Sequence, residues 1–118
     1  MNVLVTGSAG HLGEAMMRAL PDAGHHALGV DIKTSAFTHR VGSITDRAFV
    51  RRCVAEVQAV VHAATLHKPH VATHAAQDFV DTNITGILNL LEEARAAGVG
   101  AFVFTSTTSA FGRARARR

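Results

Sequence analysis

The stretch that decides the fold is residues 3–20, VLVTGSAGHLGEAMMRAL, in which an apolar run breaks into glycines and then into a helical pattern. Its first four residues are apolar or β-branched, as in a short buried strand, and its last seven favour a helix. The glycines between them, Gly7, Gly10 and Gly13, follow the spacing Gly-x-x-Gly-x-x-Gly. A glycine-rich turn at a helix N-terminus presents bare N–H groups where the helix dipole favours an anion. The stretch therefore predicts a phosphate-binding turn.

Each glycine has an expected role in this turn. Gly7 would supply the tight turn, Gly10 would let the backbone approach a pyrophosphate, and Gly13 would let the helix pack closely on the strand. A second apolar strand at residues 26–30 ends at Asp31, near the spacing of about 20 residues at which a carboxylate binds the ribose of a dinucleotide. The combination favours dinucleotide binding over the plainer interpretation that the glycines are turn residues and Asp31 a solvated strand end.

Length and composition point to one domain or less. The chain has 118 residues, of which 47% are hydrophobic, so it can bury a core. It contains no apolar run of about 18 residues, and we expect a cytoplasmic protein without a membrane partner. Cys53 is the only cysteine, which excludes an internal disulfide and favours a packing role on a helix. Four of the arginines behind the net charge of +3 lie in residues 113–118, so we expect no basic face and no nucleic-acid partner.

Helical and strand patterns alternate along the rest of the chain. Asp46 is suited to cap a helix, Pro69 indicates a loop because proline lacks an amide donor, and Gly98 is suited to end a long helix. The expected elements are a helix over residues 47–56, a strand at 59–62, a loop at 66–71, a helix from about 75 to 97 and a strand at 101–105.

Strands that alternate with helices pair in parallel through right-handed crossovers. We therefore expect an α/β fold with a Rossmann-like, doubly wound parallel sheet of order 3-2-1-4, truncated after its fourth strand. Here residues 59–62 would be the third strand and residues 101–105 the fourth. Residues 1–112 would form an incomplete NAD(P)-binding domain, followed by a basic, disordered tail at 113–118. The bare edge of the fourth strand predicts aggregation or a homodimer.

Five ordered motifs span almost the whole chain. They are TGSAGHLG at residues 6–13, Asp31, HAA at 62–64, NITG at 83–86 with NLLE at 89–92, and FTSTTSAFG at 104–112. In this order they resemble the extended short-chain dehydrogenases/reductases, also called the NAD-dependent epimerase/dehydratase family. The resemblance implies the NAD-binding portion of a sugar-nucleotide epimerase, dehydratase or related reductase. The full-length form would transfer a hydride between nicotinamide and a nucleotide sugar or other small molecule.

The resemblance also implies roles for residues around the cofactor. Asp31 would hold the adenosine ribose and favour NAD over NADP, because its charge would repel a 2′-phosphate even beside Lys33. Ser43 and Ile44 would flank adenine, although family members usually have aspartate in place of Ser43. The pyrophosphate would contact Gly7, Gly10, His11, Leu12 and Gly13, and the floor near the nicotinamide would consist of Ala63, Ala64, Thr65, Leu66 and His67.

The resemblance is incomplete for catalysis. Asn83 would help to organise the active site and Thr107 would orient the substrate oxygen, but the family's Tyr-x-x-x-Lys pair is missing because the chain has no tyrosine. An unassisted threonine hydroxyl is a poor proton donor at neutral pH. We therefore expect a truncated or frame-shifted N-terminal half that does not turn over by itself. The alternatives are a non-catalytic dinucleotide-binding or redox-sensing module and, third, a nucleic-acid-binding tail with steep salt dependence.

Two further groups of side chains carry weaker indications. His67, His70 and His74 have a spacing that could serve a metal, but Pro69 interrupts a helix there, and we expect loop histidines and no metal. The hydroxyls of residues 106–109 lack a Gly-x-Ser-x-Gly elbow, so a nucleophile is not indicated.

Overall fold

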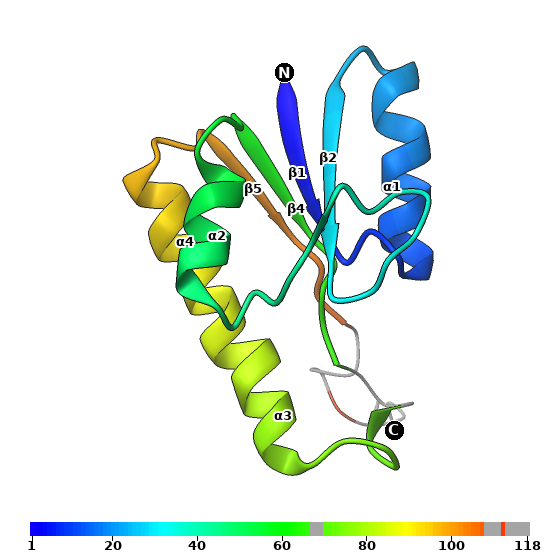
Figure 1. Cartoon of the computed structure of the whole chain (residues 1–118), viewed down its shortest axis with the longest axis vertical. Helices are drawn as coiled ribbons and strands as arrows, with labels where there is room; N and C mark the ends of the chain where they lie inside the picture. The colour runs from blue at the N-terminus through cyan, green and yellow to red at the C-terminus, as the bar shows by residue number, and fades with distance from the viewer. Residues whose placement is uncertain (67–69, 108–111, 113–118) are drawn as a thin grey trace, which may run out of the picture.

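A parallel sheet of five strands with helices on both faces organises the chain (Figure 1). This computed structural model describes residues 1–66, 70–107 and 112. The sheet has the order β3-β2-β1-β4-β5, which establishes the expected Rossmann-like architecture. The strands are β1 Asn2–Thr6, β2 His26–Asp31, β3 Arg40–Val41, β4 Ala59–His62 and β5 Ala101–Phe104.

The order 3-2-1-4 is present, but its third strand is β3, in the polar stretch after Asp31. A two-residue strand has no sequence pattern of its own, and β3 forms by pairing with the end of β2. The strand at Ala59–His62 is therefore the fourth strand and pairs with β1. We had expected it as the third strand, beside β2, and that prediction is wrong. Because β3 occupies the position beside β2, the free edge of β1 is the place where β4 can pair.

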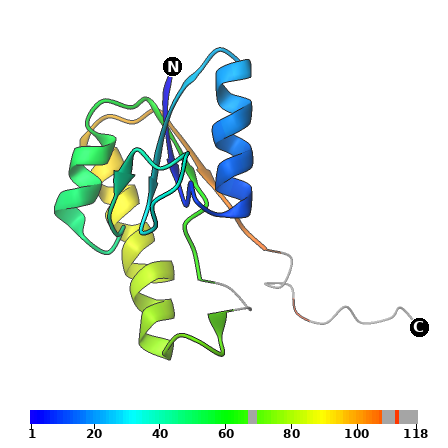
Figure 2. The same ribbon diagram turned by 45° about the vertical axis from the view of Figure 1, so that its right-hand side comes forward.

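Helices cover the sheet from both sides (Figures 1 and 2). The helix at residues 11–22 lies over β1 and β2, and the helices at residues 47–54 and 87–96 lie on the opposite face. The helix at residues 76–80 extends beyond the carboxyl ends of the strands. The expected long helix is continuous but contains a π-helical segment, and Gly98 follows it with a φ of +76°. The helices are α1 His11–Asp22, α2 Arg47–Val54, α3 Ala76–Val80, the π-helical segment Asp81–Gly86 and α4 Ile87–Ala96.

The alternation of side chains along β1 divides the core into two layers. Leu4 points to the face covered by α2 and α4, whereas Val3 and Val5 point to the face covered by α1. Cys53 packs in the first layer, as expected, and burial raises the pKa of its thiol. Among the described residues, no helix is long and apolar enough to cross a membrane.

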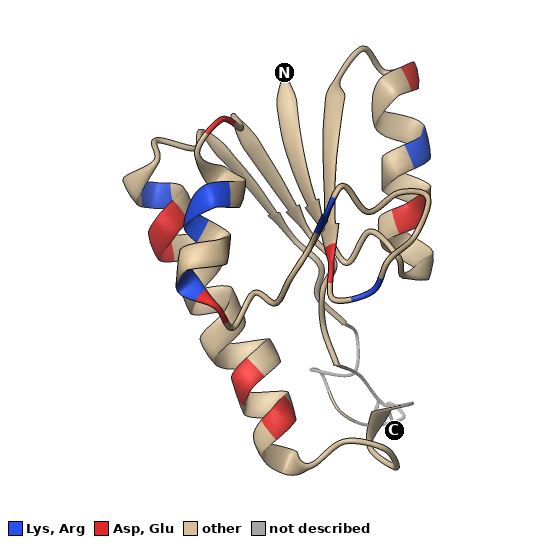
Figure 3. Cartoon of the chain, in the orientation of Figure 1, with Lys and Arg blue, Asp and Glu red and all other residues tan. Residues whose placement is uncertain are grey.

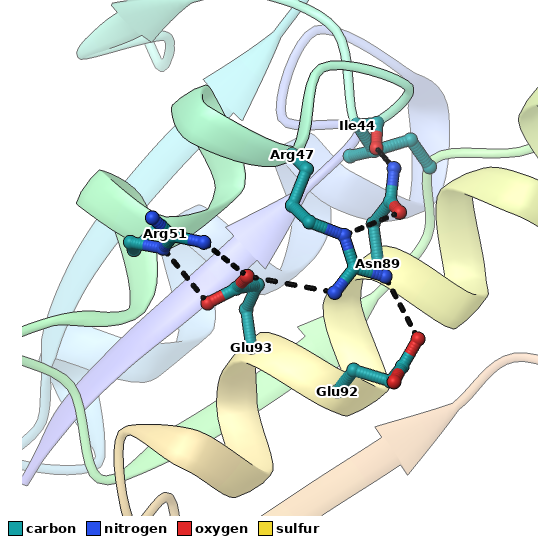
Figure 4. A network of polar contacts seen from close by, with 6 residues as sticks. All are labelled: Ile44, Arg47, Arg51, Asn89, Glu92 and Glu93. Carbon is teal, nitrogen blue, oxygen red and sulfur yellow. Dashed lines mark hydrogen bonds and ion pairs between the residues drawn. The ribbon is translucent and has the colours of Figure 1, made fainter.

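A charged network joins α2 to α4 (Figure 4). The buried carboxylate of Glu93 accepts two hydrogen bonds from Arg51, at 3.1 and 3.2 Å, and lies 3.6 Å from Arg47. Arg47 also donates to Glu92 and Asn89. Basic and acidic positions accordingly lie close together on the ribbons of α2 and α4 (Figure 3). The bond from Arg51 lowers the pKa of Glu93. The network fixes α2 against α4 over the sheet.

Candidate dinucleotide site

The glycine turn after β1 is built by close backbone contacts. Gly7 has a φ of +75°, which a side chain disfavours, and its amide donates to the carbonyl of Val30 at 2.9 Å. A Cβ at Gly7 would lie 2.8 Å from main-chain atoms of both Ala63 and Ala64. The turn is therefore pressed between the ends of β2 and β4, and glycine is required at its first position.

The other two glycines begin α1. A Cβ at Gly13 would lie 1.9 Å from the carbonyl oxygen of Gly7, so the helix packs directly on the turn as expected. Gly10 is the N-cap and provides no side-chain cap for the first turn of the helix. It is exposed, and a Cβ there would meet only the Gly7 oxygen, at 3.2 Å. His11 and Leu12 are also exposed, so the first turn of α1 is open to solvent, and the expected pyrophosphate contact there stays a prediction.

Asp31 lies next to this turn at the end of β2. One carboxylate oxygen accepts the amide of Ala9 at 3.0 Å, and the other accepts the amide of Lys33 at 2.9 Å. These two bonds fix the orientation of the carboxylate at the carboxyl edge of the sheet. Asp31 is half-buried there. The turn and the carboxylate, predicted separately from the sequence, are thus in direct contact.

A chain of hydroxyl groups also joins the turn to the loop after β2. Ser8 is fully buried and its hydroxyl lies 2.9 Å from that of Thr38, which lies 2.7 Å from that of Ser35. A Cβ at Gly29 would lie 1.9 Å from the Phe37 carbonyl oxygen, so this loop crosses β2 in close contact. The roles of Ser35 and Thr38 could not be predicted from the sequence, because hydroxyls in a polar loop show no periodic pattern.

Asn83 holds the chain that leaves β4. Its side-chain amide donates to the carbonyl of Leu66 at 2.7 Å, and its oxygen accepts the amide of Leu66 at 2.9 Å and the hydroxyl of Thr65 at 2.8 Å. Asn83 lies in the π-helical segment, a helix type found often at functional sites. The structure thus brings Asn83 to the expected floor of the site.

The remaining candidates have mixed placements. Ser43 is half-buried, and Ile44 is buried in the core with its side chain against Gly86, so its expected contact with adenine stays a prediction. Thr107 is exposed beyond the end of β5. His67 lies outside the described residues, as does the tail at 113–118.

Of the three histidines His67, His70 and His74, the structure describes the last two. The rings of His70 and His74 meet edge to face with centroids 5.3 Å apart. Within the described ranges, no group of three or more histidine, cysteine or acidic side chains could hold a metal ion.

The fold and this site define a Rossmann-like protein with a glycine turn and an acidic residue at the carboxyl edge of its sheet. The chain belongs to the NAD dependent epimerase/dehydratase family, whose sequence profile matches residues 3–118. It is 30% identical to UDP-glucose 4-epimerase of Erwinia amylovora over 95% of this chain and 38% of that enzyme. It is 32% identical to 2-alkyl-3-oxoalkanoate reductase of Stenotrophomonas maltophilia over 97% of this chain and 36% of that enzyme.

The structure is similar to that of a short-chain dehydrogenase/reductase superfamily protein from Agrobacterium tumefaciens, crystallised with bound NAD. The TM-score is 0.84 and the identity 32%, over 95% of this chain and 34% of the other. The chain therefore spans little more than a third of the length of its relatives.

Proposed function

We propose that this chain is the NAD-binding portion of an enzyme that transfers a hydride between nicotinamide and a small-molecule substrate. The observation that carries the proposal is the hydrogen bond between the glycine turn and Asp31. It supports the proposal because a helix N-terminus is suited to a pyrophosphate and a carboxylate beside it is suited to a ribose. The solved relative with bound NAD supports the same cofactor. When bound, NAD accepts or returns a hydride.

The residues of the chain would each contribute binding or orientation. The amides at the start of α1 would hold the pyrophosphate, and Asp31 would accept the ribose hydroxyls. Ala63, Ala64 and Leu66 would form the floor near the nicotinamide, with Asn83 fixing Leu66. We infer that Thr107 orients the substrate oxygen, and that a proton donor such as the family's tyrosine acts with these residues in the whole protein.

The substrate class follows from the relatives and is part of the proposal. One relative is named an epimerase of UDP-glucose and another a reductase of alkyl-oxoalkanoates, and the chain is about equally similar to both. A nucleotide sugar is our first candidate. The alternative of a non-catalytic NAD-binding module predicts binding without turnover, even when the rest of a family enzyme is supplied.

Titration calorimetry with NAD+ and NADP+ tests the proposal. We expect NAD+ to bind at least about tenfold more tightly than NADP+, because the Asp31 carboxylate repels a 2′-phosphate. Gly10→Ala should lower the affinity for NAD+ by about tenfold or more, since its methyl group would occupy the path of the pyrophosphate.

Gly100→Ala is the matched control for this test. A Cβ at Gly100 would meet only the Gln58 carbonyl oxygen, at an ordinary 3.8 Å, far from the turn. This variant should bind NAD+ like the wild type. Equal affinities for Gly10→Ala and wild type, or no binding of NAD+ at millimolar concentration, would overturn the proposal.

A further inference from the structure

We propose that His62 is a positioning residue for the dinucleotide site, acting through the hydroxyl of Thr6 in a single imidazole tautomer. The inference rests on the proposed function, because the groups that it positions are those expected to face the cofactor. Thr6 and His62 begin two of the motifs quoted from the sequence, but neither was assigned a role at the site. Both are buried, at 0% and 3% exposure, on the same side of neighbouring strands.

The hydrogen bonds at Thr6 determine which atom carries the proton. The Thr6 hydroxyl oxygen accepts the amides of Ala63 and Ala64, each at 3.1 Å. The Ala63 amide also reaches the Thr6 carbonyl oxygen at 3.2 Å. A hydroxyl group has two acceptor sites and one donor, so its proton is directed to the His62 Nδ1, which lies 2.8 Å away. Nδ1 must therefore be unprotonated, and the neutral ring carries its proton on Nε2.

This arrangement connects three strand ends at the site. Thr6 ends β1 immediately before Gly7, and the amides that it binds begin the floor after β4. The main-chain oxygen of His62 accepts both the amide and the hydroxyl of Thr105, at 3.3 and 2.7 Å, at the end of β5. His62 thus links the glycine turn, the floor and the strand that leads to Thr107.

Packing holds the ring in place for this role. The His62 ring stacks on Phe104 at a centroid distance of 6.1 Å and an interplanar angle of 17°. Phe102 lies 6.4 Å away in a tilted arrangement. The ring therefore has little freedom to turn its Nδ1 away from Thr6. A neutral histidine is the form that this partly apolar, buried position favours.

Nitrogen-15 NMR of histidine-labelled protein, in solution or after sedimentation, tests the tautomer without any ligand. The His62 resonances, assigned by their loss in His62→Asn, should show an unprotonated Nδ1 and a protonated Nε2 at pH 7. In Thr6→Val, which keeps the shape but removes the hydroxyl, this preference should weaken, and Thr6→Ser should restore it. A protonated Nδ1 in the wild type would overturn the proposal.

Calorimetry with NAD+ as the probe tests the effect on the site. We expect Thr6→Val and His62→Leu to bind NAD+ about tenfold more weakly than wild type. In Thr6→Val the amides of Ala63 and Ala64 lose their acceptor, and in His62→Leu the Thr6 hydroxyl proton loses its acceptor. Thr6→Ser, and His62→Asn with an acceptor oxygen near the Nδ1 position, should bind within about threefold of wild type.

Val54→Ala controls for a general loss of stability. Val54 is 1% exposed at the end of α2 that leads to the amino end of β4, opposite to the carboxyl ends of the strands. Its truncation should therefore lower the melting temperature without changing the affinity for NAD+. If Val54→Ala weakens binding as much as Thr6→Val, or if Thr6→Val binds like wild type, the positioning role is wrong. Failure of the wild type itself to bind NAD+ would instead overturn the proposed function, while the NMR result would still decide the tautomer.

Discussion

Burial of His62 makes the stability of this chain depend on pH. Desolvation lowers the pKa of its imidazole from 6.5 to about 4. Between these two values the unfolded chain binds a proton that the folded chain does not, so the free energy of unfolding falls as the pH falls from 6.5 to about 4. Between pH 6.5 and pH 4 the free energy of unfolding falls by on the order of 3 kcal/mol because of this residue. Above pH 6.5 His62 causes no such loss.

Urea denaturation at a series of pH values measures this dependence. His62→Asn should be less stable than wild type at pH 7, and the difference should shrink as the pH falls to 4, because the variant has no proton to take up at this position. Below about pH 4.5 the carboxylate of Glu93, whose pKa is lowered by Arg51, contributes a separate loss in both proteins. A difference between variant and wild type that is the same at pH 7 and pH 4 would contradict the prediction.

Some site residues could be predicted one at a time and others could not. Asp31 and the three glycines follow from local patterns, because a turn and a strand end are set by neighbours in sequence. The bond from Thr6 to His62 joins residues 56 positions apart, and it depends on which strand lies beside β1. Since residues 59–62 were expected beside β2, this contact could not be found from the sequence.

The start of α2 shows how a single cap stabilises an element. Asp46 is the N-cap, as predicted, and its carboxylate accepts the amide of Phe49 at 3.2 Å. Asp46→Ala should lower the free energy of unfolding by about 1 kcal/mol, because this amide loses its partner. Asp46→Asn keeps an acceptor oxygen and should lie close to wild type in thermal or urea denaturation. Equal losses in the two variants would show that the cap bond contributes little.

Element boundaries separate what local sequence determines from what packing determines. The helix ends at Asp46 and Gly98 were predictable because caps use specific residues. The π-helical segment at Asp81–Gly86 was not, since its residues have the same apolar spacing as the α-helix on either side. Its extra residue per turn is accompanied by the bonds of Asn83 to Leu66, which are tertiary contacts. The strand β3 likewise exists only through its pairing with β2.

The outer edge of the sheet concerns the molecule as a whole. Within the described part of the chain, β5 pairs only with β4, and Val103 and Phe104 are 57% and 56% exposed. An exposed apolar edge strand offers unpaired backbone groups to another copy. We expect the 118-residue chain to self-associate at micromolar concentration, and Val103→Lys to weaken this association by about tenfold or more.

Sedimentation velocity over a range of concentrations tests this expectation. Val71→Lys is the control, because Val71 is 67% exposed but lies in a loop away from the edge. It should associate like wild type. A wild-type chain that stays monomeric at the highest concentrations would mean that the edge is not a contact surface.

The compact placement of the turn, Asp31 and the floor within the first 66 residues has a consequence for synthesis. Translation runs from the N-terminus, so β1, β2 and β4, with the glycine turn and Asp31, leave the ribosome before α4 and β5 do. A ligand that binds this early portion favours its folded form by mass action. A high concentration of the proposed cofactor, NAD, would then favour folding of the nascent chain, and a low concentration would leave the newly made chain more exposed to proteases.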